Sequence, residues 1–364
     1  MTAIDASVNR APLDAFVERP ARPYPGLRPF KSDEWSIFCG REISVREVVY
    51  QLGDHGVAFV HGGSGCGKSS LIAAGVLPNL QRNAALAGTP MAHATIRPSH
   101  GPLGALAGAL ANCLGFPPPK HLEDVPSAAL SDPIAAWTTA VLFADDIGAL
   151  VEQAVEAKGL ALFCLVVDQF EEIFAWARER RASDVEVLVE FLASIRRARS
   201  KRFAVIVTMR SDFLSDCAQF PALSIVINSC QYYVPNLDER GLERAIREPA
   251  AMYGGEVKPE LVVRLMTEAT GNVDALPVLQ HALMRMAERK DIAQRDDDTG
   301  SGEWALGLED YYAVTTDVHR TKPLPDGQRD TALTVHAEAI RAPPRPPAPP
   351  PARSQKIAKS KQRR

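Results

Sequence analysis

Apolar residues in the first two thirds of the chain are concentrated in short, nearly continuous runs. The clearest runs, rich in β-branched and aromatic side chains, cover 57–60, 161–167 and 203–208, with a weaker one at 94–96. Such runs are typical of strands buried on both faces of a parallel sheet. Helical spacing of apolar residues lies between them, as at 42–52 and 184–197. Strands that alternate with helices predict an α/β fold, a parallel sheet with flanking helices.

After about residue 231 the pattern changes to helical spacing alone. Leu276, Leu279, Leu283 and Met286 fall on one face of a predicted helix, and no further strong strand run follows. This part predicts a second, mostly helical domain, interrupted by a hydrophilic loop at 296–302. The predicted organisation is a disordered lead at 1–20, an α/β core at 21–235, a helical region at 236–335, and a disordered Pro-rich basic tail at 336–364.

Composition and charge limit the classes of partner. Hydrophobic residues make up 46% and charged residues 23% of the chain, which is ordinary for a globular protein with a real core. The net charge of −3 provides no general attraction to nucleic acid or to an anionic membrane, so no specific nucleic acid and no membrane partner is expected. The least polar stretch, 101–116, is too short and too interrupted to span a bilayer, and we expect a packed helix there.

Cysteine usage and the two ends of the chain bear on its compartment. The six cysteines lie far apart without a CxxC pair, which fits neither a zinc site nor a disulfide framework. The first residues carry acids and no apolar core, so they do not form a signal peptide. From residue 341 onward, seven prolines, eight Lys or Arg residues and no acid predict a solvated, disordered tail. A reducing cytoplasm is the predicted compartment.

A glycine-rich loop follows the first apolar run and carries the strongest chemical signal. It matches the GxxxxGK[ST] pattern of a P-loop, also called Walker A. The predicted nucleotide-binding residues are Gly62, Gly63, Ser64, Gly65, Cys66, Gly67, Lys68, Ser69 and Ser70. The glycines allow backbone N–H groups to face phosphates, and the following helix presents its positive end to the same anion. Lys68 supplies a charge for the β- and γ-phosphates, and the Ser69 hydroxyl is a predicted Mg²⁺ ligand. The chain is therefore predicted to be a P-loop NTPase that binds ATP or ADP with Mg²⁺.

Acidic and basic residues at the ends of later strands are predicted to complete the site. Asp168 ends the run at 161–167, where a Walker B aspartate would hold the metal. Glu171 and Glu172 follow, and either could activate a water molecule or instead be a solvated carboxylate at a helix start. Gln169 stands directly after Asp168, so hydrolysis is expected to be slow or differently organised. Arg210 ends the next strand and is predicted either to sense the γ-phosphate or to pair with Asp212.

Several motifs together resemble the novel STAND class of P-loop NTPases, specifically the first of the novel STAND domains, which often precedes WD repeats in bacterial proteins. Besides the P-loop, they are PGLRPF at 25–30, FCGRE at 38–42, VDQFEE at 167–172, MRSDF at 209–213 and ALPVLQHALMR at 275–285. The similarity runs from about Tyr24 to Tyr312. No NKxD motif for reading guanine occurs, so adenine is the expected base.

The resemblance implies a nucleotide-dependent signalling switch, with ADP holding a closed monomer and ATP permitting self-association. It implies that Gly40 and Arg41 lie near the adenine or ribose, that Pro277 of the helical lid touches the base, and that Arg210 is the first sensor. It also implies that the lid at 236–335 is similar to a winged helix. The chain departs from the family pattern after Val314, where the family usually carries a Gly-Gly and this chain has Thr315 and Thr316. We interpret the later change of composition as a truncation or frameshift near residue 340, before the sensor repeats.

Three functions remain open at this point. The leading one is a switch with slow ATP hydrolysis, a nucleoside-triphosphate hydrolase only in that limited sense. The second is an AAA-like remodelling ATPase with rapid turnover. The third is a non-enzymatic scaffold or regulator that keeps a structural nucleotide.

Overall fold

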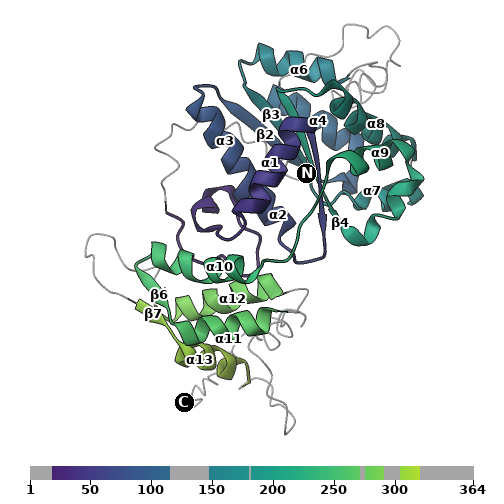
Figure 1. Cartoon of the computed structure of the whole chain (residues 1–364). Coiled ribbons are helices and arrows are strands. Elements are labelled where there is room, and N and C mark those ends of the chain that lie inside the picture. Colours follow the sequence, from purple (N-terminus) through teal and green to yellow (C-terminus); the bar gives the residue numbers. More distant parts are fainter. Residues whose placement is uncertain (1–18, 115–146, 180–181, 271–274, 291–303, 320–364) are drawn as a thin grey trace, which may run out of the picture.

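The computed structural model describes residues 19–114, 147–179, 182–270, 275–290 and 304–319 (Figure 1). Most of the predicted lead at 1–20, the hydrophilic loop at 296–302 and the tail at 336–364 lie outside the described residues. The described chain forms an α/β core and a mostly helical lid beside it, which Figure 1 shows as an upper and a lower part.

A five-stranded, all-parallel sheet forms the centre of the α/β core. Its strands, in spatial order, are β2 (Met91–Ile96), β3 (Leu162–Val167), β4 (Phe203–Arg210), β1 (Val57–Gly62) and β5 (Gln231–Tyr233). The register pairs Gly62 of β1 with Arg210 of β4, and Ile96 of β2 with Val167 of β3. The carboxyl ends of β1 to β4 therefore meet at one edge, where α/β sheets bind ligands.

Alternating side chains of each central strand enter two separate apolar clusters. Val57 and Phe59 of β1 belong to the larger cluster, whereas Ala58 and Val60 belong to the smaller one on the opposite face. The larger cluster is covered by α4 (Pro102–Leu114), α6 (Ile147–Ala157), α7 (Glu172–Glu179), α8 (Ala182–Ala198) and α9 (Pro221–Cys230). The smaller one is covered by α1 (Glu42–His55) and by a continuous helix made of α2 (Lys68–Ser70), a π-helical segment (Leu71–Val76) and α3 (Leu77–Leu86). Both faces are buried, which explains the continuous apolar runs.

Short 3₁₀ turns connect these elements, at Ser32–Ile37, Pro98–His100, Ser211–Phe213 and Asp216–Gln219. The predicted helix at 101–116 is α4, and no helix of the described residues is long and apolar enough to cross a membrane. The predicted strand at 94–96 is present and extends back to Met91.

The lid consists of α10 (Glu239–Met252), α11 (Pro259–Ala269), α12 (Ala275–Glu288), α13 (Leu308–His319) and a two-stranded parallel pair, β6 (Gly255–Val257) with β7 (Trp304–Leu306). Its own apolar cluster includes Leu279, Leu283 and Met286, which the helical spacing predicted to share one face.

Trp304 covers Gly255 so closely that a Cβ there would lie 2.0 Å from the indole, and its Nε1–H donates to the Tyr253 carbonyl (2.9 Å).

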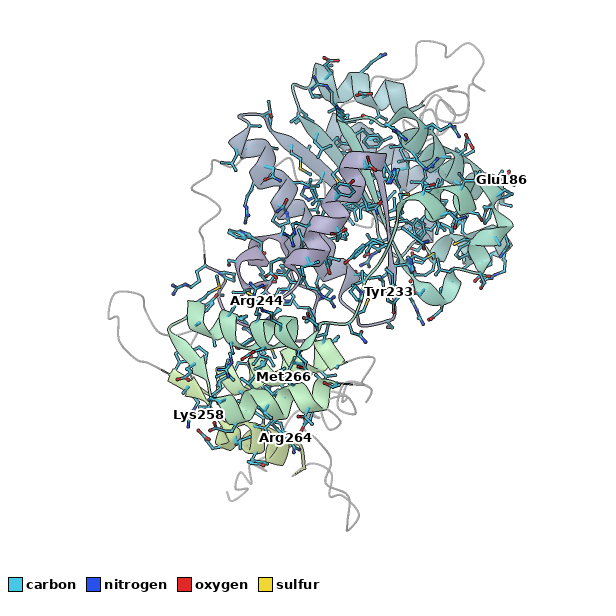
Figure 2. The ribbon with its side chains drawn as sticks, in the orientation of Figure 1. Glu186, Tyr233, Arg244, Lys258, Arg264 and Met266 are labelled. Atoms are coloured by element: carbon cyan, nitrogen blue, oxygen red, sulfur yellow. The ribbon has the colours of Figure 1, made fainter. Side chains whose placement is uncertain are left out.

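The N-terminal strap, residues 19–27, packs against the lid before the chain enters the core. The side chain of Tyr24 is buried within the lid cluster, and its hydroxyl donates to the Ile246 carbonyl. Gly26 lies directly against Met284, whose sulfur would be 2.5 Å from a Cβ at that position. Lid and core are also joined by an ion pair between Arg244 of α10 and Glu42 of α1 (2.8 Å), and Figure 2 places Arg244 at the side of the lid that faces the core.

Candidate functional site

The glycine-rich loop leaves β1 at the carboxyl edge of the sheet and leads into the helix that begins at Lys68. Gly65 (φ 71°) and Gly67 (φ 93°) have left-handed backbone conformations, which favour glycine. A Cβ on Gly62 would lie 2.7 Å from the Cys66 sulfur, so a side chain at that position would require the Cys66 side chain to move. The Leu71 N–H bonds to the Gly67 carbonyl (2.8 Å) and starts the helix whose positive end faces the loop.

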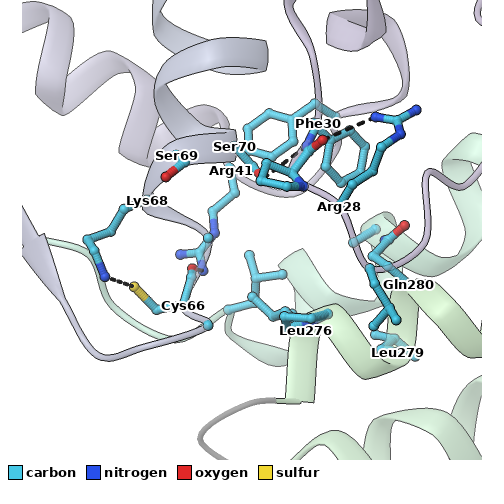
Figure 3. A pocket seen from close by; sticks show the side chains of 18 of the residues that line it. Arg28, Phe30, Arg41, Cys66, Lys68, Ser69, Ser70, Leu276, Leu279 and Gln280 are labelled. Carbon is cyan, nitrogen blue, oxygen red and sulfur yellow. Dashed lines mark hydrogen bonds between the residues drawn. The ribbon is translucent and has the colours of Figure 1, made fainter. Parts of the chain in front are cut away.

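The Lys68 ammonium lies inside the curve of this loop. It donates to the carbonyls of Gly62 (3.0 Å) and Gly63 (2.7 Å) and lies 3.9 Å from the Cys66 sulfur, a contact that is dashed in Figure 3. A positive charge at this place, at the start of a helix, suits a phosphate group.

Asp168 is the centre of a polar cluster between the loop and the strand ends. Its side chain accepts hydrogen bonds on Oδ1 from Ser69 Oγ (3.2 Å) and Thr208 Oγ1 (2.6 Å), while Oδ2 pairs with Arg97 (3.2 Å). The residue is only 6% exposed. The structure thus brings the two predicted metal ligands, Ser69 and Asp168, into contact. A hydroxyl and a carboxylate are hard oxygen donors, and this pair fits Mg²⁺.

The segment after Asp168 turns sharply and places its two carboxylates in different surroundings. Gln169 has a left-handed backbone (φ 60°), and its N–H donates to Thr208 Oγ1 (3.2 Å). Glu171 accepts a hydrogen bond from the backbone N–H of Arg210 (3.3 Å). Glu172 begins α7, and its buried Oε2 has no hydrogen-bond partner among the described residues.

Arg210 forms the ion pair that was the alternative to a phosphate contact. Its guanidinium pairs with Asp212 and lies over the ring of Phe213, 5.9 Å from the centroid. The residue ends β4 beside Gly62, so its backbone lies at the same edge of the sheet as the loop.

Arg41 contacts the loop, and its neighbour Gly40 contacts the lid. The Arg41 guanidinium, 5% exposed, donates to the carbonyls of Cys66 (3.0 Å) and Pro235 (2.6 Å). Burial lowers the pKa of this guanidinium below its usual value, although arginine stays protonated at neutral pH. Gly40 (φ 87°) touches α10 of the lid, because a Cβ there would lie 2.2 Å from the Gly241 carbonyl oxygen.

A cavity of about 260 Å³ lies between the glycine-rich loop and the lid (Figure 3). Its polar wall is residues 65–70 of the loop and helix, with Arg41. Its apolar wall includes Phe30 and the α12 residues Leu276, Pro277 and Leu279. The cavity therefore unites the loop, Arg41 and Pro277, whereas its lining does not include Gly40, Gly62, Gly63, Ser64, Asp168, Glu171, Glu172 or Arg210. A charged end and an apolar end suit a ligand with a phosphate chain and a flat base.

Some residues of this region were not predicted from the sequence. Thr208 and Arg97 reach Asp168, and the one signal for them is their position at strand ends. Arg28 and Gln280 line the cavity, and the buried Gln280 Oε1 has no partner among the described residues, so a ligand could donate to it. The two residues come from separate segments, and they line one cavity only because the lid packs against the core.

Comparisons with known proteins identify related sequences and folds. The family model described as novel STAND NTPase 1 matches residues 23–316. No curated protein matches the sequence. The ORC2 protein of Aeropyrum pernix in its ADP form is 15% identical, with a TM-score of 0.45 over 90% of this chain and 83% of that chain. Cdc6p of Pyrobaculum aerophilum is 14% identical (TM-score 0.43, covering 94% and 87%), and domain III of the Thermotoga maritima replication initiation protein DnaA is also 14% identical (TM-score 0.42, covering 76% and 92%).

Proposed function

The chain belongs to the novel STAND NTPase 1 family, and we propose that it is a switch that binds ATP or ADP and hydrolyses ATP slowly. The observation that carries this proposal is the cavity bounded by the P-loop on one side and by α12 of the lid on the other. A ligand that contacts both walls changes the free energy of lid closure, and a ligand can shift a two-state equilibrium only through such differential contacts.

The lining of the cavity supports a specific orientation of the nucleotide. The phosphates would lie at the P-loop with Lys68, and the base would lie against the apolar wall with Pro277. Ser69 and Asp168 would hold Mg²⁺, which when bound supplies positive charge to the β- and γ-phosphates. Arg41 would act on the nucleotide through the loop, because it bonds to the Cys66 carbonyl, and Gly40 would act through the lid, because it lies against Gly241.

Slow hydrolysis is proposed because the Glu171 carboxylate is engaged by the backbone of β4 and one carboxylate oxygen of Glu172 is buried. Gln169 occupies the position after Asp168, and Glu171 accepts a hydrogen bond from the backbone of β4. A general base must reach the attacking water within hydrogen-bonding distance. Glu171 and Glu172 could do so only after a rearrangement of this turn, and Arg210 would have to leave Asp212 before it could sense a phosphate.

The proposed switch would signal by self-association in the ATP state.

We place the proposed switch in the cytoplasm. All six cysteines are free thiols, as in a reducing compartment. Burial raises the pKa of the Cys39 and Cys164 thiols to about 12, which keeps both thiols protonated and poorly nucleophilic at neutral pH.

The first test is the nucleotide retained after gentle purification, identified by mass. Retained ADP is expected. Calorimetry with ATP should then show binding by the parent and by Lys201→Ala, an exposed lysine at the opposite ends of the strands, but no binding by Lys68→Ala. Equal ATP affinity of Lys68→Ala and the parent would contradict the proposed site.

A second measurement separates the switch from the two other functions. Steady-state turnover well above about 1 s⁻¹ would favour a remodelling ATPase. Salt-dependent binding of DNA would favour a regulator that keeps a structural nucleotide. Slow turnover with ATP-dependent self-association in light scattering is the result expected for the switch.

A further inference from the structure

Arg97 pairs with the same carboxylate that is proposed to hold the metal. The distance from its Nη2 to Asp168 Oδ2 is 3.2 Å. The other oxygen, Oδ1, already accepts hydrogen bonds from Ser69 and Thr208. Among the described residues, the Asp168 side chain therefore contacts Ser69, Thr208 and Arg97, and Arg97 is the charged partner of the three.

The backbone of Arg97 is held firmly, whereas its side chain is not. Arg97 directly follows β2, and the Asp168 N–H donates to the carbonyl of Ile96 (2.9 Å), which fixes the two strand ends beside each other. Pro98 begins the next turn, and Gly101 at its end packs under Trp176 (3.7 Å from a Cβ). The Arg97 side chain is 58% exposed, so the guanidinium can move from one partner to another without a change of backbone.

Other arginines near the site have partners that are not proposed metal ligands. Arg41 is buried against two backbone carbonyls, and Arg210 pairs with Asp212 over Phe213. Arg28 forms a two-point ion pair with Glu34. Arg97 differs because its partner, Asp168, is the group whose negative charge a bound metal would share.

We propose that Arg97 discriminates ATP from ADP by moving from Asp168 to the γ-phosphate. The inference rests on the proposed function, since it requires that Ser69 and Asp168 hold the metal of a nucleotide. Two cations on one carboxylate repel each other, so Arg97 loses its favourable partner when the metal site is filled. ATP would offer a new acceptor, because the metal that Ser69 and Asp168 would hold supplies positive charge to the phosphates, and the γ-phosphate would then lie near Asp168 and within reach of Arg97. ADP offers none, and Arg97 then competes with the metal for Asp168.

The test is a set of calorimetric titrations with ADP in EDTA, ADP with Mg²⁺, and a non-hydrolysable ATP analogue with Mg²⁺. The proteins are the parent, Arg97→Ala, Arg97→Lys and the control Arg197→Ala, which loses an exposed ion pair with Glu190 on α8. A charge-assisted hydrogen bond to phosphate corresponds to an affinity change of about tenfold or more. Arg97→Ala should therefore bind the analogue about tenfold or more weakly, bind ADP in EDTA like the parent, and bind ADP with Mg²⁺ equally or more tightly. Arg97→Lys should retain part of the preference, because it keeps the charge but not the planar fork.

The outcomes separate this inference from the proposed function. A parent that binds no nucleotide overturns both. A parent that binds nucleotide, with an Arg97→Ala variant that keeps the parent's ratio of analogue to ADP affinity, overturns the role of Arg97 alone. An equal loss for all three ligands also overturns it, because that result indicates damage to the loop.

Discussion

Gly40→Ala tests how closely the core and the lid must approach each other. At Gly40 (φ 87°) a Cβ would lie 2.2 Å from the Gly241 carbonyl oxygen of α10, whereas real Cβ contacts are essentially never below 3.0 Å. The lid would have to shift by at least 0.8 Å, the difference between these two distances. Gly88 is the matched control, because it has a similar backbone (φ 72°) and nothing within 4 Å of a Cβ.

The two substitutions share one cost and differ in another. A left-handed backbone costs a non-glycine residue about 1–2 kcal/mol, and this applies to both positions. Forcing an atom into a packed contact typically costs about 1–3 kcal/mol more, and this applies to Gly40 alone. We therefore expect the free energy of unfolding to fall by about 1–2 kcal/mol in Gly88→Ala and by about 2–5 kcal/mol in Gly40→Ala.

The assay combines urea unfolding with calorimetry of ADP binding. Gly40→Ala should also weaken ADP binding, because the shifted lid moves Pro277 and Leu276 away from the P-loop. Gly88→Ala should leave ADP affinity unchanged. If the two variants lose the same stability and keep the same ADP affinity, the close contact between Gly40 and Gly241 has no role in closure, and the reasoning is wrong.

Two further predictions concern the polar groups at the carboxyl edge of the sheet. Asp168→Asn should bind ADP in EDTA like the parent and lose about tenfold or more of its Mg²⁺-dependent phosphate release, since it removes a charged metal ligand; unchanged turnover would argue against that role. Burial lowers the pKa of His61, so the stability from its neutral form is present above the unfolded pKa of about 6.5 and is lost as the pH falls through the lower folded pKa. Urea unfolding should show the parent losing more stability than His61→Asn between about pH 7 and pH 5, and parallel pH curves for the two proteins would contradict this.

The central strands could be predicted from the sequence because strands buried on both faces consist almost entirely of apolar residues. The run at 161–167 contains β3 and the run at 203–208 covers most of β4, and the side chains of both strands fill both faces of the sheet. β5, β6 and β7 were missed because each has only three residues, and β5 lies at the sheet edge with little burial. Three residues carry no readable period.

The candidate site was predictable as far as its chemistry is local. The P-loop pattern is contained in eight consecutive residues, and Asp168 directly follows a strong strand run. The contacts of Thr208 and Arg97 with Asp168 depend instead on which strands are neighbours in the sheet, and neighbour order is a property of the whole fold. The approach of Gly40 to Gly241 joins positions about two hundred residues apart, beyond the reach of any local pattern.

The N-terminal strap packs against the lid, so the chain passes between the lid side and the core at two places instead of one. The chain leaves the strap for the core after Leu27, and it returns from β5 to the lid through Leu237, and both residues line the cavity. If the lid moves as a rigid body held at these two points, the rotation that it can make most easily is about the line that joins them. Here that line borders the cavity itself, so its occupant would sit beside the axis of any lid movement. A small change in the occupant's length would then become a large displacement at α13, on the far side of the lid from the core (Figure 1).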